Sequence, residues 1–184
     1  KKGDVGTKNL NKCLQYTLNP KSDNKNEKTF GQTIFRQGDK VMQTKNNYDV
    51  VWEKEDGTVG VGIFNGDLGY ITNIYKENGE IEVLFDDGKK VIYTSSVLEE
   101  LDLAYAITIH KSQGSEFQHV IMPVSKNYYK MLYNKLIYTG VSRAKKSLII
   151  IGEEESFVMA TNNDYSTNRK TNLKMQILNK FLEN

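Results

Sequence analysis

Cysteine and proline are scarce in this sequence, and their scarcity narrows the class of protein. The 184 residues include one cysteine, Cys13, and two prolines. One cysteine excludes an internal disulfide and a zinc site built from several cysteines, so we expect a reducing, cytoplasmic setting. Cys13 has apolar neighbours and is interpreted as a small core residue rather than a nucleophile.

Long apolar runs are absent as well. No run approaches the roughly 18 residues that a transmembrane helix needs, and the chain does not open on a signal peptide, so we expect no membrane partner. The composition, 38% hydrophobic and 26% charged, is that of a globular chain with room for one medium domain or two small ones. The acidic run Glu153-Glu154-Glu155 lacks the partners of a metal site and is interpreted as a solvated loop, so no metal site is predicted.

Charge of one sign does not dominate either. The formal net charge is +2, so the overall charge does not indicate nucleic acid, and a basic surface has to come from local placement. The chain starts at Lys1 without a methionine and enters a helix-like segment at once. We therefore expect it to be a piece of a longer protein.

A short helix is predicted over residues 7–18. Thr7 is the expected N-cap, and Asn19-Pro20 ends the helix. The lysine-rich residues 21–29 have no apolar periodicity and are predicted to form a loop. Four residues recur at helical spacing and are expected to share one face: Leu10, Cys13, Leu14 and Leu18.

Residues 30–101 have the texture of a small β-barrel. The predicted strands are 33–35, 40–44, 70–75, 81–85 and 90–93. Turn signals that accept positive φ separate them: Gly38-Asp39, Asn65-Gly66-Asp67, Asn78-Gly79 and Asp86-Asp87-Gly88. Five short strands in this stretch predict a barrel of the SH3-like kind. The segment 49–62, which contains Trp52, is assigned to no element.

After Leu101 the pattern becomes α/β. The predicted elements are a strand at 104–108, a turn at 111–116, a strand at 120–124, an amphipathic helix at 127–142 with Tyr128, Leu132, Leu136 and Ile137 inward, and a strand at 147–151. A last helix is expected to start at the cap Thr171, with Leu173, Ile177, Leu178 and Phe181 on one face. Continuous apolar strands joined by a helix predict parallel pairing with both faces buried. The fold class is therefore α/β, a parallel-sheet domain interrupted by the barrel.

The first stretch that indicates chemistry is 104–117, where a predicted buried strand runs into a polar turn. Ligands of α/β folds bind at the carboxyl ends of strands. Gly114 allows a backbone N–H to approach a ligand closely, and Glu116 is an acceptor suited to a sugar hydroxyl. Five residues of the turn supply polar groups: Thr108, His110, Lys111, Ser112 and Gln113.

The second stretch is 136–146, where Arg143 follows a predicted helix and precedes a strand. A guanidinium group suits a phosphate site because it is planar, always charged and able to donate two parallel hydrogen bonds.

Together the two stretches resemble motifs V and VI of superfamily 1 DNA helicases of the RecD type. The pair, in this order and at this separation, is more specific than either stretch alone. Residues 2–20 resemble the segment after motif IV, and 35–48 with 63–69 resemble the SH3-like 2B insertion. The resemblance thus covers nearly the whole chain. Relatives usually show an Ala-Leu/Ile-Thr-Arg run at the second stretch, whereas this chain has Gly140-Val141-Ser142-Arg143, which keeps the hydroxyl and the guanidinium.

The resemblance implies a division of the chain and a mechanism. Residues 1–29 and 102–184 would form part of a RecA-like domain 2A, and 30–101 would form domain 2B. ATP and Mg²⁺ would be held mainly by an N-terminal motor domain of the same protein, with Arg143 as the catalytic arginine finger. Gly114 and Glu116 would face the nucleotide. This chain has no G-x-x-x-x-G-K-[ST] loop, so we expect it to hydrolyse no ATP alone.

Single-stranded DNA is the partner that the resemblance implies, with travel from 5′ to 3′. Thr108, His110 and Lys111 would contact the strand. Recombination or repair, and a nuclease complex of the exodeoxyribonuclease V kind, are further implications of the family. Binding without sequence preference needs cations for phosphates and flat faces for bases. Five residues of the barrel offer such groups and are predicted to line the DNA path: Lys40, Lys45, Asn46, Asn47 and Tyr48.

Two alternatives stay open at this point. A non-enzymatic SH3-, KOW- or Tudor-like module that docks protein or RNA explains residues 30–101 but leaves 104–146 unexplained. An RNA helicase of the same superfamily is distinguished by competition between DNA and RNA strands.

Overall fold

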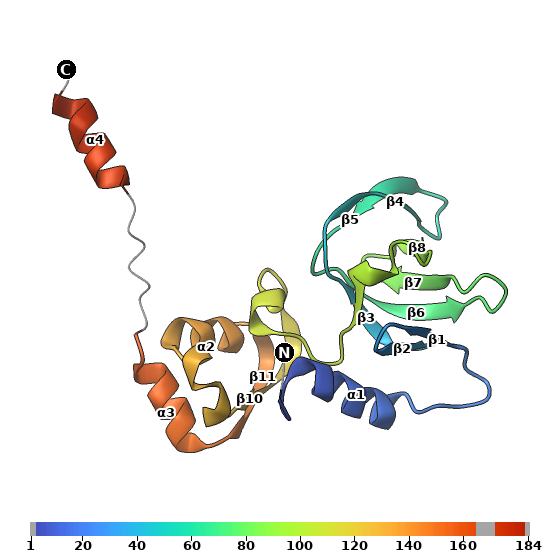
Figure 1. Ribbon diagram of the computed structural model, residues 1–184, viewed down its shortest axis with the longest axis horizontal. Helices are drawn as coiled ribbons and strands as arrows, with labels where there is room; N and C mark the ends of the chain where they lie inside the picture. Colours follow the sequence, from blue (N-terminus) through green and yellow to red (C-terminus); the bar gives the residue numbers. More distant parts are fainter. Residues whose placement is uncertain (1–2, 165–171, 183–184) are drawn as a thin grey trace. The chain divides into compact units, whose positions relative to one another are not determined.

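The computed structural model describes residues 3–164 and 172–182, and the chain divides into two compact units (Figure 1). The first unit is Lys1–Gln118 and the second is His119–Asn184. None of the helices in the described ranges is long and apolar enough to cross a membrane.

Helix α1 (Thr7–Leu18) confirms the predicted helix but not its inward face. The N-cap is Gly6 rather than Thr7, and no side chain caps the helix. The buried residues are Asn11 and Gln15, whereas Cys13 is exposed, so the interpretation of Cys13 as a core residue was wrong. The inward face is polar because it meets backbone groups and a buried carboxylate, which need hydrogen-bond partners.

Strand β1 (Glu27–Phe30) pairs antiparallel with β2 (Thr33–Arg36) in a hairpin. The predicted loop 21–29 therefore ends earlier than expected. Glu27 lies opposite Arg36, and a 2.6 Å ion pair joins their side chains. This cross-strand ion pair stabilises the extended conformation of β1.

The rest of the first unit is a seven-stranded sheet in the order β5-β4-β8-β7-β6-β3-β9. Its pairings are antiparallel. Alternate side chains of these strands, among them Ile71, Val83 and Tyr93, form the core together with Phe35 of β2. The strands are β3 (Lys40–Gln43), β4 (Asn47–Glu53), β5 (Val59–Ile63), β6 (Leu68–Ile74), β7 (Ile81–Phe85), β8 (Lys90–Tyr93) and β9 (Leu101–Leu103), with a 3-10 turn η1 (Leu98–Glu100) before β9.

The unassigned segment 49–62 contributes most of the hairpin β4–β5, and Trp52 is the last residue but one of β4. Trp52 pairs with Gly60 across the two strands, and its ring covers the glycine so closely that an added Cβ would lie 2.3 Å from the indole. The Lys89 ammonium lies 5.3 Å from the ring centroid, within the range of a cation–π interaction. Trp52 is thus partly buried and packs against the core.

Gly60→Ala is expected to push the indole of Trp52 off the sheet. Because the chain has one tryptophan, its fluorescence emission should shift to the red, and the free energy of unfolding should fall by about 1–3 kcal/mol. Val61→Ala, at an exposed position next along β5, is the matched control and should leave the spectrum unchanged. An unshifted Gly60→Ala spectrum would contradict the close packing.

The predicted strand 104–108 was wrong, because the strand in this region is β9, which ends at Leu103. The backbone N–H of Ala104 still donates to the Lys40 carbonyl oxygen at 2.8 Å, and the chain then leaves the sheet. A 3-10 turn η2 (Ile109–Ser112) follows. The apolar run was too short to distinguish a strand from a buried connection.

A two-stranded sheet of β10 (Phe117–Val124) and β11 (Ala144–Gly152) belongs to the second unit, apart from the first two residues of β10. His119 near the start of β10 contacts Ser147 of β11 at 2.7 Å. At the other end, a Cβ on Gly152 would collide with the carbonyl oxygen of Val124. The two strands therefore run in the same direction, as predicted.

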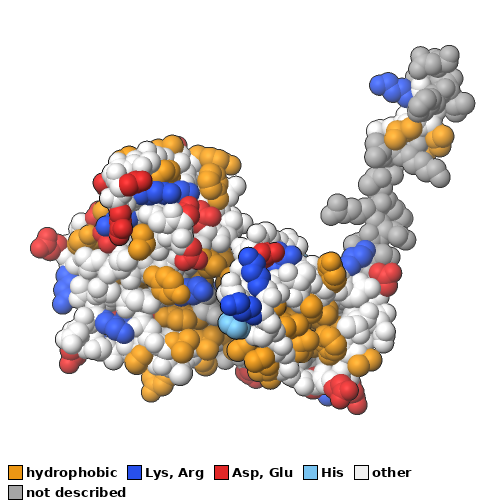
Figure 2. Space-filling view, turned by 180° about the vertical axis from the view of Figure 1, so that it is seen from behind, with side chains coloured by type: hydrophobic (Ala, Val, Ile, Leu, Met, Phe, Trp, Pro, Cys, Tyr) orange, Lys and Arg blue, Asp and Glu red, His pale blue; other side chains and the backbone are white. Residues whose placement is uncertain are grey.

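The expected burial of both sheet faces is wrong for the described part of the chain. Apolar side chains are exposed on the second unit (Figure 2), and three from the two strands are Ile121, Ile149 and Ile151. These exposed branched side chains lie on one face of the sheet, which therefore lacks cover among the described residues, whereas Met122 and Val124 on the other face are buried.

The predicted helix 127–142 is broken into a 3-10 segment η3 (Lys126–Met131) and helix α2 (Asn134–Val141). Tyr128 has non-helical dihedral angles, and Leu132 and Tyr133 are extended. The apolar periodicity still places side chains correctly: Leu132, Leu136 and Ile137 are buried, and Tyr128 is half-buried.

The run Glu153-Glu154-Glu155 is the start of helix α3 (Glu154–Asn162), not a loop. Glu153 accepts hydrogen bonds from the Lys126 N–H at 2.9 Å and the Ser156 hydroxyl at 2.7 Å. These two donors lower the pKa of Glu153.

The last helix, α4 (Leu173–Leu182), confirms the predicted element. Its expected cap Thr171 and the side chains of Leu173 and Phe181 lie outside the described residues. Ile177 and Leu178 are exposed.

Candidate nucleic-acid and nucleotide interface

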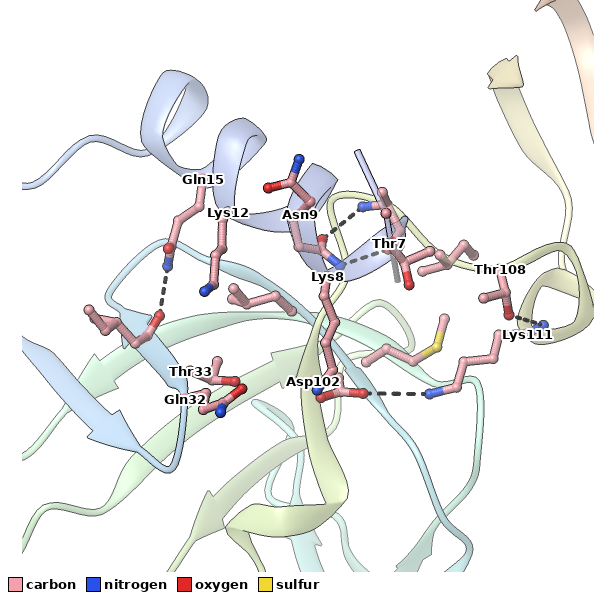
Figure 3. Close-up of a pocket in the computed structure, with 17 residues that line it drawn as sticks. Thr7, Lys8, Asn9, Lys12, Gln15, Gln32, Thr33, Asp102, Thr108 and Lys111 are labelled. Carbon is pink, nitrogen blue, oxygen red and sulfur yellow. Dashed lines mark hydrogen bonds and ion pairs between the residues drawn. The ribbon is translucent and has the colours of Figure 1, made fainter. Parts of the chain in front are cut away.

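The first unit contains a groove of about 600 Å³ between α1, the β1–β2 turn and residues 102–111 (Figure 3). Three lysines line it, Lys8 and Lys12 from α1 and Lys111 from η2. The carboxylate that lines it, Asp102, lies 3.8 Å from the Lys111 ammonium. The excess of cations suits a polyanion. Its apolar lining consists of Ile34, Met42, Leu103, Ala106 and Ile107.

The turn after residue 107 places two predicted site residues on this groove. Thr108 is the N-cap of η2, and its hydroxyl accepts a hydrogen bond from the Lys111 N–H at 3.3 Å. Its carbonyl oxygen accepts from the Lys111 and Ser112 N–H groups. Thr108 and Lys111 line the groove, whereas His110 is exposed and does not line it.

Asn11 of α1 fixes the backbone just before this turn. Its side-chain amide donates to the Ala106 carbonyl oxygen at 2.9 Å and accepts from the Ala106 N–H at 2.9 Å. The amide thus satisfies both backbone groups of a residue that no strand pairs.

Asp39 is a fully buried carboxylate at the turn between β2 and β3. The Tyr105 hydroxyl donates to it at 2.9 Å, and burial together with the Asp39 charge raises the pKa of Tyr105. Four donors reach the carboxylate in all: Gln15 Nε2, Asn19 Nδ2, the Arg36 N–H and the Tyr105 hydroxyl. Multiple hydrogen bonds of this kind allow a charge to be buried.

Lys8 and Lys12, which line the groove, were not predicted from the sequence as binding residues. The available signal was their i, i+4 spacing beside Asn11 and Gln15, which have the same spacing. Once the Asn11 and Gln15 face is taken as the inward one, the two lysines fall on its border. The leucine periodicity pointed to a different face.

None of the five residues predicted from the barrel lines the groove, and four of them lie at or next to the β3–β4 turn. The Lys45 ammonium lies 2.6 Å from Glu99, and this hydrogen bond raises the pKa of Lys45 and lowers that of Glu99. The Asn46 side chain accepts from the Asn65 N–H at 2.9 Å. Asn47 donates to Glu100 at 2.9 Å. These groups hold the turn in place.

Tyr48 and Lys40 have different surroundings. Tyr48 is 66% exposed and meets Phe64 edge to face, with ring centroids 5.8 Å apart. Lys40 lies at the other end of β3, with its ammonium 5.9 Å from the Tyr70 ring centroid. It lines a second, smaller pocket of about 380 Å³ together with four carboxylate residues: Asp67, Asp86, Asp87 and Glu116.

The two residues predicted to face the nucleotide from the first unit are exposed. Gly114 has φ of +86°, which favours glycine, and there is open space where a Cβ would be. Glu116 lines the smaller pocket with Lys40.

Arg143 belongs to the second unit and follows the last turn of α2. Its Nε donates to the Thr139 carbonyl oxygen at 3.1 Å, and its Nη2 donates to the Ser142 hydroxyl at 3.0 Å. A cation at a helix C-terminus is favoured by the helix dipole. The guanidinium therefore has a defined local position, while its approach to Gly114 and Glu116 stays a prediction.

Two family descriptions match the chain. Residues 10–85 match the ATP-dependent RecD-like DNA helicase SH3 domain, and residues 103–151 match the UvrD-like helicase C-terminal domain. The chain thus matches two helicase-type domains, one after the other along the sequence.

Three relatives extend this match over most of the chain. It is 34% identical to an uncharacterized protein of Methanocaldococcus jannaschii over 94% of this chain and 16% of that protein. It is 32% identical to the ATP-dependent RecD2 DNA helicase of Deinococcus radiodurans, over 87% of this chain and 20% of that helicase. It is 28% identical to the RecBCD enzyme subunit RecD of Haemophilus influenzae, over 98% of this chain and 23% of that subunit.

The chain belongs to the RecD-type helicases. It spans about a fifth of the length of the curated relatives that it matches. The predicted division into residues 30–101 and 1–29 with 102–184 stays a prediction.

Proposed function

We propose that this chain is the C-terminal part of an ATP-dependent DNA helicase that travels 5′ to 3′ and acts in recombination or repair. The observation that carries the proposal is a RecD-like SH3 domain followed in one chain by a UvrD-like helicase C-terminal domain. Relatives over most of the chain are named as an ATP-dependent DNA helicase and as a subunit of the RecBCD enzyme. A nuclease complex is therefore a further candidate partner.

The nucleotide side of the proposal depends on Arg143. ATP and Mg²⁺ would be held mainly by a motor domain N-terminal to this chain, in a RecA-like arrangement with the second unit. Arg143 would stabilise the charge that develops on the transferred phosphate, and Gly114 and Glu116 would approach the nucleotide. The hydrogen bonds of Arg143 to Thr139 and Ser142 support a guanidinium oriented before ATP arrives.

The strand side of the proposal depends on the groove. Lys8, Lys12 and Lys111 would neutralise phosphates, and Thr108 would offer a hydroxyl beside them. His110, which is exposed and does not line the groove, stays a predicted contact. The barrel residues Lys40, Lys45, Asn46, Asn47 and Tyr48 also stay predicted contacts, and the exposed ring of Tyr48 offers a face for a base.

Lys12→Ala is expected to weaken binding of oligo-dT by this chain. Removing the interaction of one lysine with one phosphate should lower the slope of log affinity against log salt by about 0.7 for a single strand. Lys90→Ala, which removes an exposed lysine of β8 outside the groove, should change neither affinity nor slope. Fluorescence anisotropy with labelled oligo-dT at several salt concentrations measures both, and equal slopes for the two variants would contradict the groove as the strand path.

The same assay tests the function itself. The wild-type chain is expected to bind oligo-dT more tightly than a proline-rich peptide, and DNA should compete better than an RNA strand of the same length. Peptide binding without oligo-dT binding would replace the helicase proposal with a docking module. Better competition by RNA would indicate an RNA helicase.

A further inference from the structure

The groove has three walls that come from distant parts of the chain, and one carboxylate connects them. The walls are α1, strand β2 with its preceding turn, and the 102–111 segment. Asp39 lies in the turn after β2 and is fully buried. Its four hydrogen-bond donors come from all three walls or the residues next to them.

Gln15 connects the first two walls. It lines the groove, and its side-chain amide donates to Asp39 at 2.5 Å and to the Ile34 carbonyl oxygen at 2.9 Å. Asn19, one residue past the end of α1, donates to the other carboxylate oxygen at 2.7 Å. The N–H of Arg36 in β2 donates at 2.7 Å. Helix α1 and strand β2 are therefore held by a common acceptor.

Tyr105 connects the third wall. Its hydroxyl donates to Asp39 at 2.9 Å, and it lies three residues before Thr108. The last backbone hydrogen bond to the sheet is that of the Ala104 N–H to Lys40, and residues 105–108 form no strand, so sheet pairing does not fix the position of 105–108. Asn11 holds the backbone at Ala106, and Tyr105 is the side-chain anchor. Hydrogen bonds to a buried carboxylate are short and directional, so they favour one arrangement of their donors.

We propose that Asp39 and Tyr105 are positioning residues that hold Thr108 and Lys111 against the α1 lysines for strand binding. This inference rests on the proposed function. The SH3-like sheet that carries Asp39 then acts on the strand path through the Tyr105 hydroxyl, without contacting the strand at this point. Loss of the hydroxyl leaves the 105–112 segment in several arrangements, and binding weakens in proportion to the fraction that remains competent.

The test uses Tyr105→Phe, which removes one hydroxyl and leaves Asp39 three other donors, so that the chain still folds. Tyr75→Phe is the matched control, because its hydroxyl also donates to a carboxylate, Glu82 at 3.0 Å, in the same unit but away from the groove. Two measurements are made on each variant: amide hydrogen exchange of residues 106–115 and affinity for oligo-dT.

Tyr105→Phe is expected to speed exchange in 106–115, with β6–β8 unchanged, and to weaken oligo-dT binding about threefold or more. Tyr75→Phe should do neither. Unchanged exchange in 106–115 would overturn the inference, as would faster exchange with wild-type affinity. If the wild-type chain binds no oligo-dT, the proposed function fails, whereas the exchange comparison still decides whether Tyr105 anchors the segment.

Discussion

Arg143→Ala, made in the helicase that contains this chain, is expected to lower ATP turnover about 10³-fold at saturating oligo-dT. ATP affinity should change far less, because an arginine finger acts mainly on charge that develops in the transition state. The structure contributes the local reason. The guanidinium donates to the Thr139 carbonyl oxygen and the Ser142 hydroxyl. The Arg143 side chain therefore loses little conformational freedom when ATP binds. Steady-state phosphate release and equilibrium nucleotide binding separate the two effects.

Two further variants make this result specific. Lys146→Ala removes an exposed cation three residues away and should leave turnover unchanged. Arg143→Lys keeps the charge but loses the planar pair of donors, so it should restore only a small part of the lost rate. The 184-residue chain alone should release no phosphate. Turnover by Arg143→Ala within about tenfold of the wild type would contradict the finger role.

Asp39→Ala is expected to have the largest effect on stability. The substitution leaves the side-chain amides of Gln15 and Asn19 and the Tyr105 hydroxyl without their buried acceptor. Unsatisfied buried donors cost about 1–3 kcal/mol each, and partial rearrangement of the amides reduces the total, so the free energy of unfolding should fall by about 3–5 kcal/mol. Urea unfolding of the chain, followed by circular dichroism, measures the change.

Asp87→Ala is the control for this prediction. Asp87 is likewise a hydrogen-bonded carboxylate, paired with the Lys89 ammonium at 2.8 Å, but its side chain is 50% exposed. An ion pair that water screens contributes about 1 kcal/mol or less. Similar losses of stability for the two alanine variants would show that burial of Asp39 and its four donors has no special importance.

The sequence predicted the elements whose limits are marked by local signals. The turns Asn78-Gly79 and Asp86-Asp87-Gly88 separate the strands β6, β7 and β8, and glycines with positive φ occupy both turns. The hairpin β4–β5 was not predicted because its sequence does not alternate between apolar and polar residues in step with burial. Its exposed face carries three valines, Val51, Val59 and Val61, beside Asp49 and Glu53. Gly60 and Gly62 lie where the other face would have side chains. Cross-strand packing of Trp52 on Gly60 decides this region, and that contact is not local.

The candidate site was also predicted in part. The motif resemblance singled out Thr108 and Lys111, and the structure places both on one groove. It did not indicate Lys8 or Lys12, because the leucine periodicity of α1 suggested the wrong inward face. The partner of Asn11 is 95 residues away, so no local pattern announces that a polar face is the buried one. Tertiary hydrogen bonding here overrides the usual preference for apolar burial.

The way in which Asn11 holds Ala106 determines which of the two positions tolerates change. Both hydrogen bonds go to backbone atoms of residue 106, and those atoms are the same for every amino acid except proline. Position 106 is therefore open to side chains that fit its half-buried surroundings. Position 11 is restricted to a side chain that both donates and accepts at this length, so substitution is freer at the turn than on the helix.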